Sequence, residues 1–167
     1  MAIQAGWSGR FYEDFEVGDI YQHPLGRTIT ETDEVWFSSL VTSPNQLHFN
    51  KDYASRTHFG QLTVNAPFTN ALVTGLSVSD ISQNGINLEW TYIKVPNPLF
   101  IGETVYAESE VLEKRESKSK PAQGIVTVRT RGITDTGKIV IELERKILIY
   151  KREHAPQLNL FPQAAKA

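Results

Sequence analysis

The stretch between Gln61 and Val78 contains no charged side chain, and this feature constrains the fold of the chain more than any other. Pro67 follows Asn65 by two residues, which suits the first turn of a helix because a proline there loses no hydrogen bond. We therefore predict a helix that begins around Asn65. A helix with so little charge has to be enclosed by the rest of the protein. Its predicted apolar stripe consists of Val64, Phe68, Ala71, Leu72 and Leu76.

The segments around this helix have the pattern of β-strands. In the last of them the apolar side chains alternate, and Asp135-Thr-Gly137 supplies a tight turn just before it. A buried helix combined with antiparallel strands that share one apolar face predicts an α+β fold, in which a sheet of five or more strands wraps around a central helix. The predicted strands cover residues 20–30, 88–95, 104–112, 125–133 and 139–150.

A shorter helix is predicted before the central one. Thr30 followed by Asp33 resembles a capping box, in which two side chains satisfy the first free amides of a helix. The helix ends near Thr42 and leads into the segment VTSPNQLH, which contains His48. Its apolar residues recur at helical spacing: Val35, Trp36, Phe37, Leu40 and Val41.

Length and composition indicate how many domains the chain forms and where the protein is located. A chain of 167 residues has the length of one domain, so we expect a single domain over 1–167, with a core at about 11–150 and flexible ends at 1–9 and about 154–167. The amino-terminal segment lacks a basic region followed by an apolar run, and no segment reaches the ~20 apolar residues that cross a bilayer. We expect a cytoplasmic protein without a membrane partner.

Several classes of function are excluded by charge and residue type. A net charge of −2 argues against nucleic acid as a partner. Without cysteine the chain has no thiolate nucleophile and no cysteine-based metal site. His23, His58 and His154 are scattered without the spacing of metal ligands, so no metal site is expected.

His48 is the residue that most suggests chemistry. It precedes the uncharged helix, whose first amides near Asn65 and Ala66 are free donors that carry partial positive charge. A general base opposite such amides suits enolate chemistry on a thioester, because the amides hold the carbonyl oxygen as it gains charge. Two alternatives remain open: His48 is a packed loop residue, or Thr63 or Asn65 caps the amides in the ordinary way.

Two segments, SSLVTSPNQLHFNKDYASRTHFGQLTVNAPFTNALVTGLS and VPNPLFIGETVYAESEVLEKRE, resemble the MaoC-like dehydratases, also called R-specific enoyl-CoA hydratases, which have the hotdog fold. The resemblance covers about residues 11 to 150. Asn45, Leu47 and His48 match the end of the family motif. The chain departs from the family where Ser43 replaces an aspartate five residues before the histidine, and where Asn65-Ala66 replaces a His-Gly pair at the start of the helix.

The resemblance implies a role for each residue of the site. His48 would be the acid/base for water that adds across the double bond of an enoyl-CoA, while Ser43 and Asn45 would orient that water without accepting its proton. Asn65 and Ala66 would bind the thioester oxygen, and Thr74 would line the pocket. Coenzyme A is part of the substrate, so the resemblance implies no other cofactor. It also implies a homodimer or a higher homo-oligomer.

The stretch from Arg115 to Pro121, followed by Gly124-Ile-Val126, resembles a branch of the family that acts on short dicarboxylic or branched acyl-CoA such as mesaconyl-CoA. A neutral Ser43 fits such a substrate, since two carboxylates about 4 Å apart repel by roughly 4 kcal/mol at an effective dielectric of 20. Arg115, Lys118 and Lys120 would meet the phosphates of coenzyme A, or form a solvated turn.

Two other functions compete with a hydratase or dehydratase. A hotdog thioesterase would use the same helix amides, but it usually needs a carboxylate on or near the central helix, and that helix carries none. A non-catalytic acyl-CoA-binding subunit is the second alternative, because the aspartate of the family motif is absent.

Overall fold

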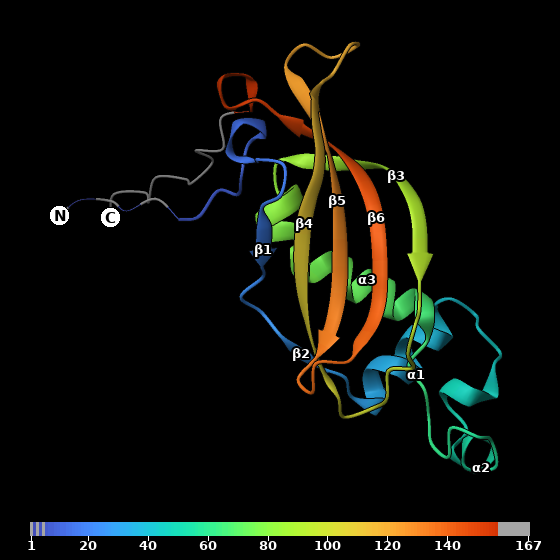
Figure 1. Ribbon diagram of the computed structural model, residues 1–167. Helices are drawn as coiled ribbons and strands as arrows, with labels where there is room; N and C mark the ends of the chain where they lie inside the picture. The colour runs from blue at the N-terminus through green and yellow to red at the C-terminus, as the bar shows by residue number, and fades with distance from the viewer. Residues whose placement is uncertain (1, 3, 5, 157–167) are drawn as a thin grey trace, which may run out of the picture.

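The computed structural model describes residues 2, 4 and 6–156 (Figure 1). The helices are α1 (Glu31–Leu40), α2 (Lys51–Ser55) and α3 (Ala66–Ser77), and the strands are β1 (Ile20–Gln22), β2 (Arg27–Thr28), β3 (Gly85–Lys94), β4 (Thr104–Glu116), β5 (Gln123–Thr134) and β6 (Ile139–Tyr150). Single helical turns lie at Tyr12–Asp14, Gln46–His48, Val78–Ser82 and Arg152–His154.

The six strands form one antiparallel sheet in the order β1, β4, β5, β6, β3, with β2 also paired to β4. The sheet curves around α3, which packs across β4, β5 and β6 (Figure 1). The predicted α+β architecture is therefore confirmed. The expected first strand is divided into β1 and β2, because the chain leaves the sheet between Gln22 and Arg27.

The helix α3 lies very close to the sheet. A Cβ atom added to Gly132 on β5 would lie only 2.6 Å from Cγ2 of Val73 on the helix, so glycine is needed for the contact. Val73 is fully buried, and the core around it includes Leu143 of β6. Most of the predicted apolar stripe faces the core: Val64 is buried, and Phe68, Leu72 and Leu76 pack against the core cluster. Ala71 is exposed, and the fully enclosed positions of the helix are the unpredicted Thr69, Val73 and Ser77.

The helix α1 begins with the predicted capping box. The Thr30 hydroxyl accepts a hydrogen bond from the Asp33 amide, and the Asp33 carboxylate accepts one from the Thr30 amide. The helix buries the polar residues Glu34 and Ser38, whereas most of its apolar positions face outward. The exposed fractions are 39% for Val35, 70% for Trp36, 66% for Leu40 and 45% for Val41.

Hydrogen bonds are formed near both ends of the described chain. The indole of Trp7 donates to the Ser79 carbonyl at 3.0 Å, and His154 closes the turn that comes after β6. The rest of the tail predicted to be flexible, residues 157–167, lies outside the described residues, as do residues 1, 3 and 5.

Within the described ranges, none of the helices combines the length and the apolar character that crossing a bilayer requires.

Candidate active site

His48 ends the short turn Gln46–His48, and its side chain is only 13% exposed. Its Nδ1 atom lies 2.9 Å from the carbonyl oxygen of Thr63. A carbonyl only accepts hydrogen bonds, so Nδ1 carries the hydrogen and donates it. In the neutral ring the lone pair is then on Nε2, which is the atom available to act as a base.

A carboxylate lies beside this histidine. Glu34 of α1 is fully buried, and its Oε1 is 4.0 Å from Nδ1 of His48. Oε1 also accepts a hydrogen bond from the Ser38 hydroxyl at 2.9 Å, and Oε2 accepts one from the Asn65 amide at 2.9 Å. Burial raises the pKa of Glu34, while the Asn65 amide, the Ser38 hydroxyl and His48 act in the opposite direction.

Nothing in the sequence singles out Glu34 as a site residue, and its presence corrects one expectation. The absence of the aspartate at Ser43 suggested a site with a histidine and no carboxylate, whereas the fold supplies a carboxylate from α1. The only local signal is the spacing of Glu34 and Ser38, which places both on one face of a helix. The contact from Glu34 to Asn65 spans 31 residues, so no local pattern reveals it.

One backbone amide at the start of α3 donates no hydrogen bond within the described residues. Asn65 is the N-cap residue, but its side chain makes no capping hydrogen bond, and the Thr63 carbonyl is taken by His48. The Asn65 amide donates to Glu34, and the amide of Ala66 has no acceptor among the residues that the structure describes. The alternative in which Thr63 or Asn65 caps these amides is therefore not what the structure shows.

His48, Asn65 and Ala66 line one cavity of about 380 Å³. His48 and Ala66 thus line a common space at the start of α3, where the helix dipole carries partial positive charge. A histidine and a free amide beside one space suit enolate chemistry on a thioester. The other side of the cavity is formed by the segment between β3 and β4, which includes Asn97. The full lining is His48, Phe59, Thr63, Val64, Asn65, Ala66, Pro67, Thr69, Val95, Pro96, Asn97, Pro98, Leu99 and Val140.

Ser43 and Asn45 do not line this cavity, contrary to their predicted roles. The end of α1 explains the position of Ser43: Thr42 has φ of 53°, and the Ser43 amide donates to the Ser38 carbonyl at 2.9 Å, as in a Schellman cap. This cap directs Ser43 into a different cavity, which it shares with Ser38. Asn45 is exposed, and its side chain accepts a hydrogen bond from the Leu47 amide.

The other predicted binding residues are also placed elsewhere. Thr74 is two turns along α3 from Ala66 and does not line the His48 cavity. Arg115, Lys118 and Lys120 belong to the β4–β5 hairpin, which stands at the end of the sheet opposite α1 and α2 (Figure 1). The thirteen residues of β4 span about 40 Å at ~3.3 Å per residue. Within one chain, this hairpin therefore lies far from His48.

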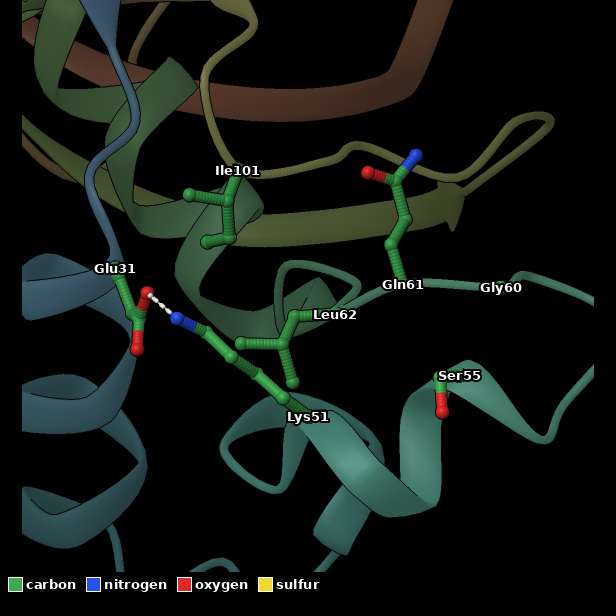
Figure 2. A pocket seen from close by; sticks show the side chains of 7 residues that line it. All are labelled: Glu31, Lys51, Ser55, Gly60, Gln61, Leu62 and Ile101. Carbon is green, nitrogen blue, oxygen red and sulfur yellow. Dashed lines mark ion pairs between the residues drawn. The ribbon is translucent and has the colours of Figure 1, made fainter.

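A second cavity of about 420 Å³ lies between α1 and α2 (Figure 2). Lys51 reaches across it to Glu31, with 2.7 Å between Nζ and Oε2. Gln61, Leu62 and Ile101 form the other wall. The ion pair already satisfies both charged groups, and His48 does not line this space.

The remaining histidines do not form a competing centre. His23 lies 2.9 Å from Asp80 and 3.0 Å from the Ser109 hydroxyl, but Ser109 is fully buried, so its hydroxyl is closed to a substrate. Burial lowers the pKa of His23. In the part of the chain that the structure describes, no three histidine, aspartate or glutamate side chains are grouped to hold a metal ion.

The sequence of this chain is similar to known proteins over most of its length. A family model described as mesaconyl-CoA hydratase matches residues 3–157. A mesaconyl-CoA hydratase from Cereibacter sphaeroides is 32% identical over 149 residues, which cover 89% of this chain and 43% of the relative. This chain therefore spans less than half the length of that curated relative.

Two solved structures show the same fold. A putative MaoC domain protein dehydratase from Chloroflexus aurantiacus superposes with a TM-score of 0.85 at 28% identity, over 98% of this chain and 47% of the other. A Mycobacterium tuberculosis protein with a double hotdog fold superposes with a TM-score of 0.79 at 18% identity, over 93% of this chain and 47% of the other. The chain has the hotdog fold and belongs to the mesaconyl-CoA hydratase family.

Proposed function

We propose that the protein catalyses the reversible hydration of a short enoyl-CoA to a 3-hydroxyacyl-CoA. The observation that carries this proposal is the shared cavity of His48 and the free Ala66 amide. The names of the family and of its relatives, which are hydratases and dehydratases, support the same reaction.

In the hydration direction, Nε2 of His48 takes a proton from water as the water oxygen bonds to C3 of the acyl group. The electrons of the double bond move toward the thioester, and the Ala66 amide donates to the oxygen that gains negative charge. The enolate then takes up a proton at C2, which His48 returns. Dehydration is the same sequence in reverse, and coenzyme A takes part only as a portion of the substrate.

Within this reaction, we propose a branched or dicarboxylic acyl group of the mesaconyl type. The family and the Cereibacter sphaeroides relative carry that substrate in their names. Neither Ser43 nor Glu34 lines the cavity, so neither places a charge beside the acyl group. The polar residues that line the cavity include the neutral Asn65 and Asn97, which suit a substrate carboxylate better than an acidic residue would.

Steady-state hydration of mesaconyl-CoA and crotonyl-CoA by the purified chain tests the proposal. We expect kcat/KM to be at least about tenfold higher for mesaconyl-CoA, the difference of one or two well-placed polar contacts. A clear preference for crotonyl-CoA would contradict the substrate assignment and leave the reaction class in place. Release of free thiol without hydration would identify a thioesterase, and tight binding without turnover a non-catalytic subunit.

We also propose that the active form is a homodimer. The strand β3 is at the edge of the sheet and is paired only with β6 among the described strands. Trp90 and Ile93 of this strand lie opposite Arg145 and Leu143, which places them on the face that packs on α3, yet they are 43% and 46% exposed. A second copy paired along β3 would cover this apolar edge. Sedimentation equilibrium under assay conditions measures the mass of the active species.

A further inference from the structure

The Glu34 side chain connects the two halves of the proposed site. One oxygen lies 4.0 Å from Nδ1 of His48, the ring that moves the proton. The other accepts the amide of Asn65, the residue directly before the free amide of Ala66. The Ser38 hydroxyl, one helical turn further along α1, donates to the same carboxylate and holds it in place.

A carboxylate at this position does something that the Thr63 carbonyl does not. The carbonyl fixes the tautomer of His48 through a hydrogen bond at 2.9 Å, but it carries no formal charge. When Nε2 takes a proton, the ring becomes a cation, and a buried negative charge nearby stabilises that cation. The hydrogen bond to Asn65 also fixes the peptide that sets the direction of the next amide along the chain.

We propose that Glu34 is a positioning residue that acts through His48 and through the Asn65 amide without contacting the substrate. This inference rests on the proposed hydration reaction and extends it. The competing explanation is purely structural: Glu34 satisfies a buried amide that would otherwise lack an acceptor. The two explanations predict different activities for a variant that removes the charge and keeps the acceptor.

The Glu34→Gln variant distinguishes the two explanations. Its side-chain oxygen still accepts the Asn65 amide, and its amide group donates to the Ser38 hydroxyl, which accepts as well as donates. We expect kcat for hydration to fall about 100-fold, the lower end of the range for losing acid/base assistance. Binding of butyryl-CoA, a saturated analogue that cannot be hydrated, should change less than about threefold. A variant that keeps wild-type kcat would overturn the inference.

The matched control is Glu31→Gln, which removes the same charge from the same helix three residues earlier. Glu31 is exposed, pairs with Lys51 and lies outside the His48 cavity. We expect its kcat to stay within about twofold of wild type. A loss as large as that of Glu34→Gln would assign the effect to the general charge of α1 and overturn the role of Glu34.

A double-mutant cycle shows whether Glu34 acts through His48. In the His48→Ala background, Glu34→Gln should cause no further loss of hydration, because the group that it supports is gone. If the losses from the two substitutions multiply, the proposal is overturned.

If Glu34→Gln fails to fold, Ser38→Ala replaces it. A loss of kcat of about tenfold, the value of one hydrogen bond to a charged group, supports the proposal. An unchanged kcat opposes it.

Failure of the proposed function is recognised separately. A wild-type chain that hydrates no enoyl-CoA, or a His48→Ala variant as active as wild type, removes the reaction itself and the inference with it. Wild-type activity that depends on His48 but not on Glu34 removes only the inference.

Discussion

Replacing His48 with alanine is expected to lower kcat/KM for enoyl-CoA hydration by about 10³-fold, within the range for loss of a general acid/base. Among the described residues, His48 is the only titratable side chain that lines the cavity with Ala66, and the variant removes it. The Ala66 amide stays in place, so binding of butyryl-CoA should be retained. The measurement is the steady-state loss of enoyl absorbance over a range of substrate concentrations.

The control for this prediction is His154→Ala. His154 is exposed in the turn after β6, and it is outside the His48 cavity. The same substitution there should leave kcat/KM within about twofold of wild type. If His48→Ala folds normally and hydrates substrate at the wild-type rate, His48 has no part in the reaction.

Replacing Leu143 with alanine is expected to lower the free energy of unfolding by about 3 kcal/mol, within the roughly 2–5 kcal/mol found for buried leucines. Leu143 is fully buried on β6, in the cluster that also contains Val73 of α3 and Ile141. The substitution leaves a cavity between the sheet and the helix that it encloses. Urea unfolding with linear extrapolation measures the change, at one fixed protein concentration because the proposed dimer makes stability depend on concentration.

The control is the same substitution at Leu25, which is 64% exposed between β1 and β2. The Leu25→Ala variant should unfold within about 0.5 kcal/mol of wild type. Equal losses at the two positions would show that the contact between β6 and α3 does not form the core of the domain.

The strands and the central helix were predictable because their patterns are strong and local. The alternating apolar residues of β6 can share one buried face only in a strand, and the uncharged run of α3 is long enough for a helix that the rest of the chain covers. Thr30 and Asp33 form the predicted cap because both partners lie within one helical turn. The break between β1 and β2 was not predicted, although Pro24 and Gly26, which interrupt strands, lie in the segment between them.

The site was predictable only in part, and the reason is the burial of α1. Helical spacing indicates which residues share a face, but it does not indicate which face the rest of the chain covers. In α1 the covered face is polar, so Glu34 becomes a partner of His48 while Trp36 is exposed. Ser43 stands at the position of the family aspartate in sequence, but the Schellman cap at the end of α1 turns it into another cavity.

A crystal structure with a bound enoyl-CoA tests the central claim most directly. We predict that the thioester oxygen lies about 3 Å from the Ala66 amide, with Nε2 of His48 close enough to C3 to hold the attacking water between them. An acyl group bound instead in the cavity of Glu31 and Lys51, or a carbonyl oxygen that accepts no hydrogen bond from Ala66, would contradict the account.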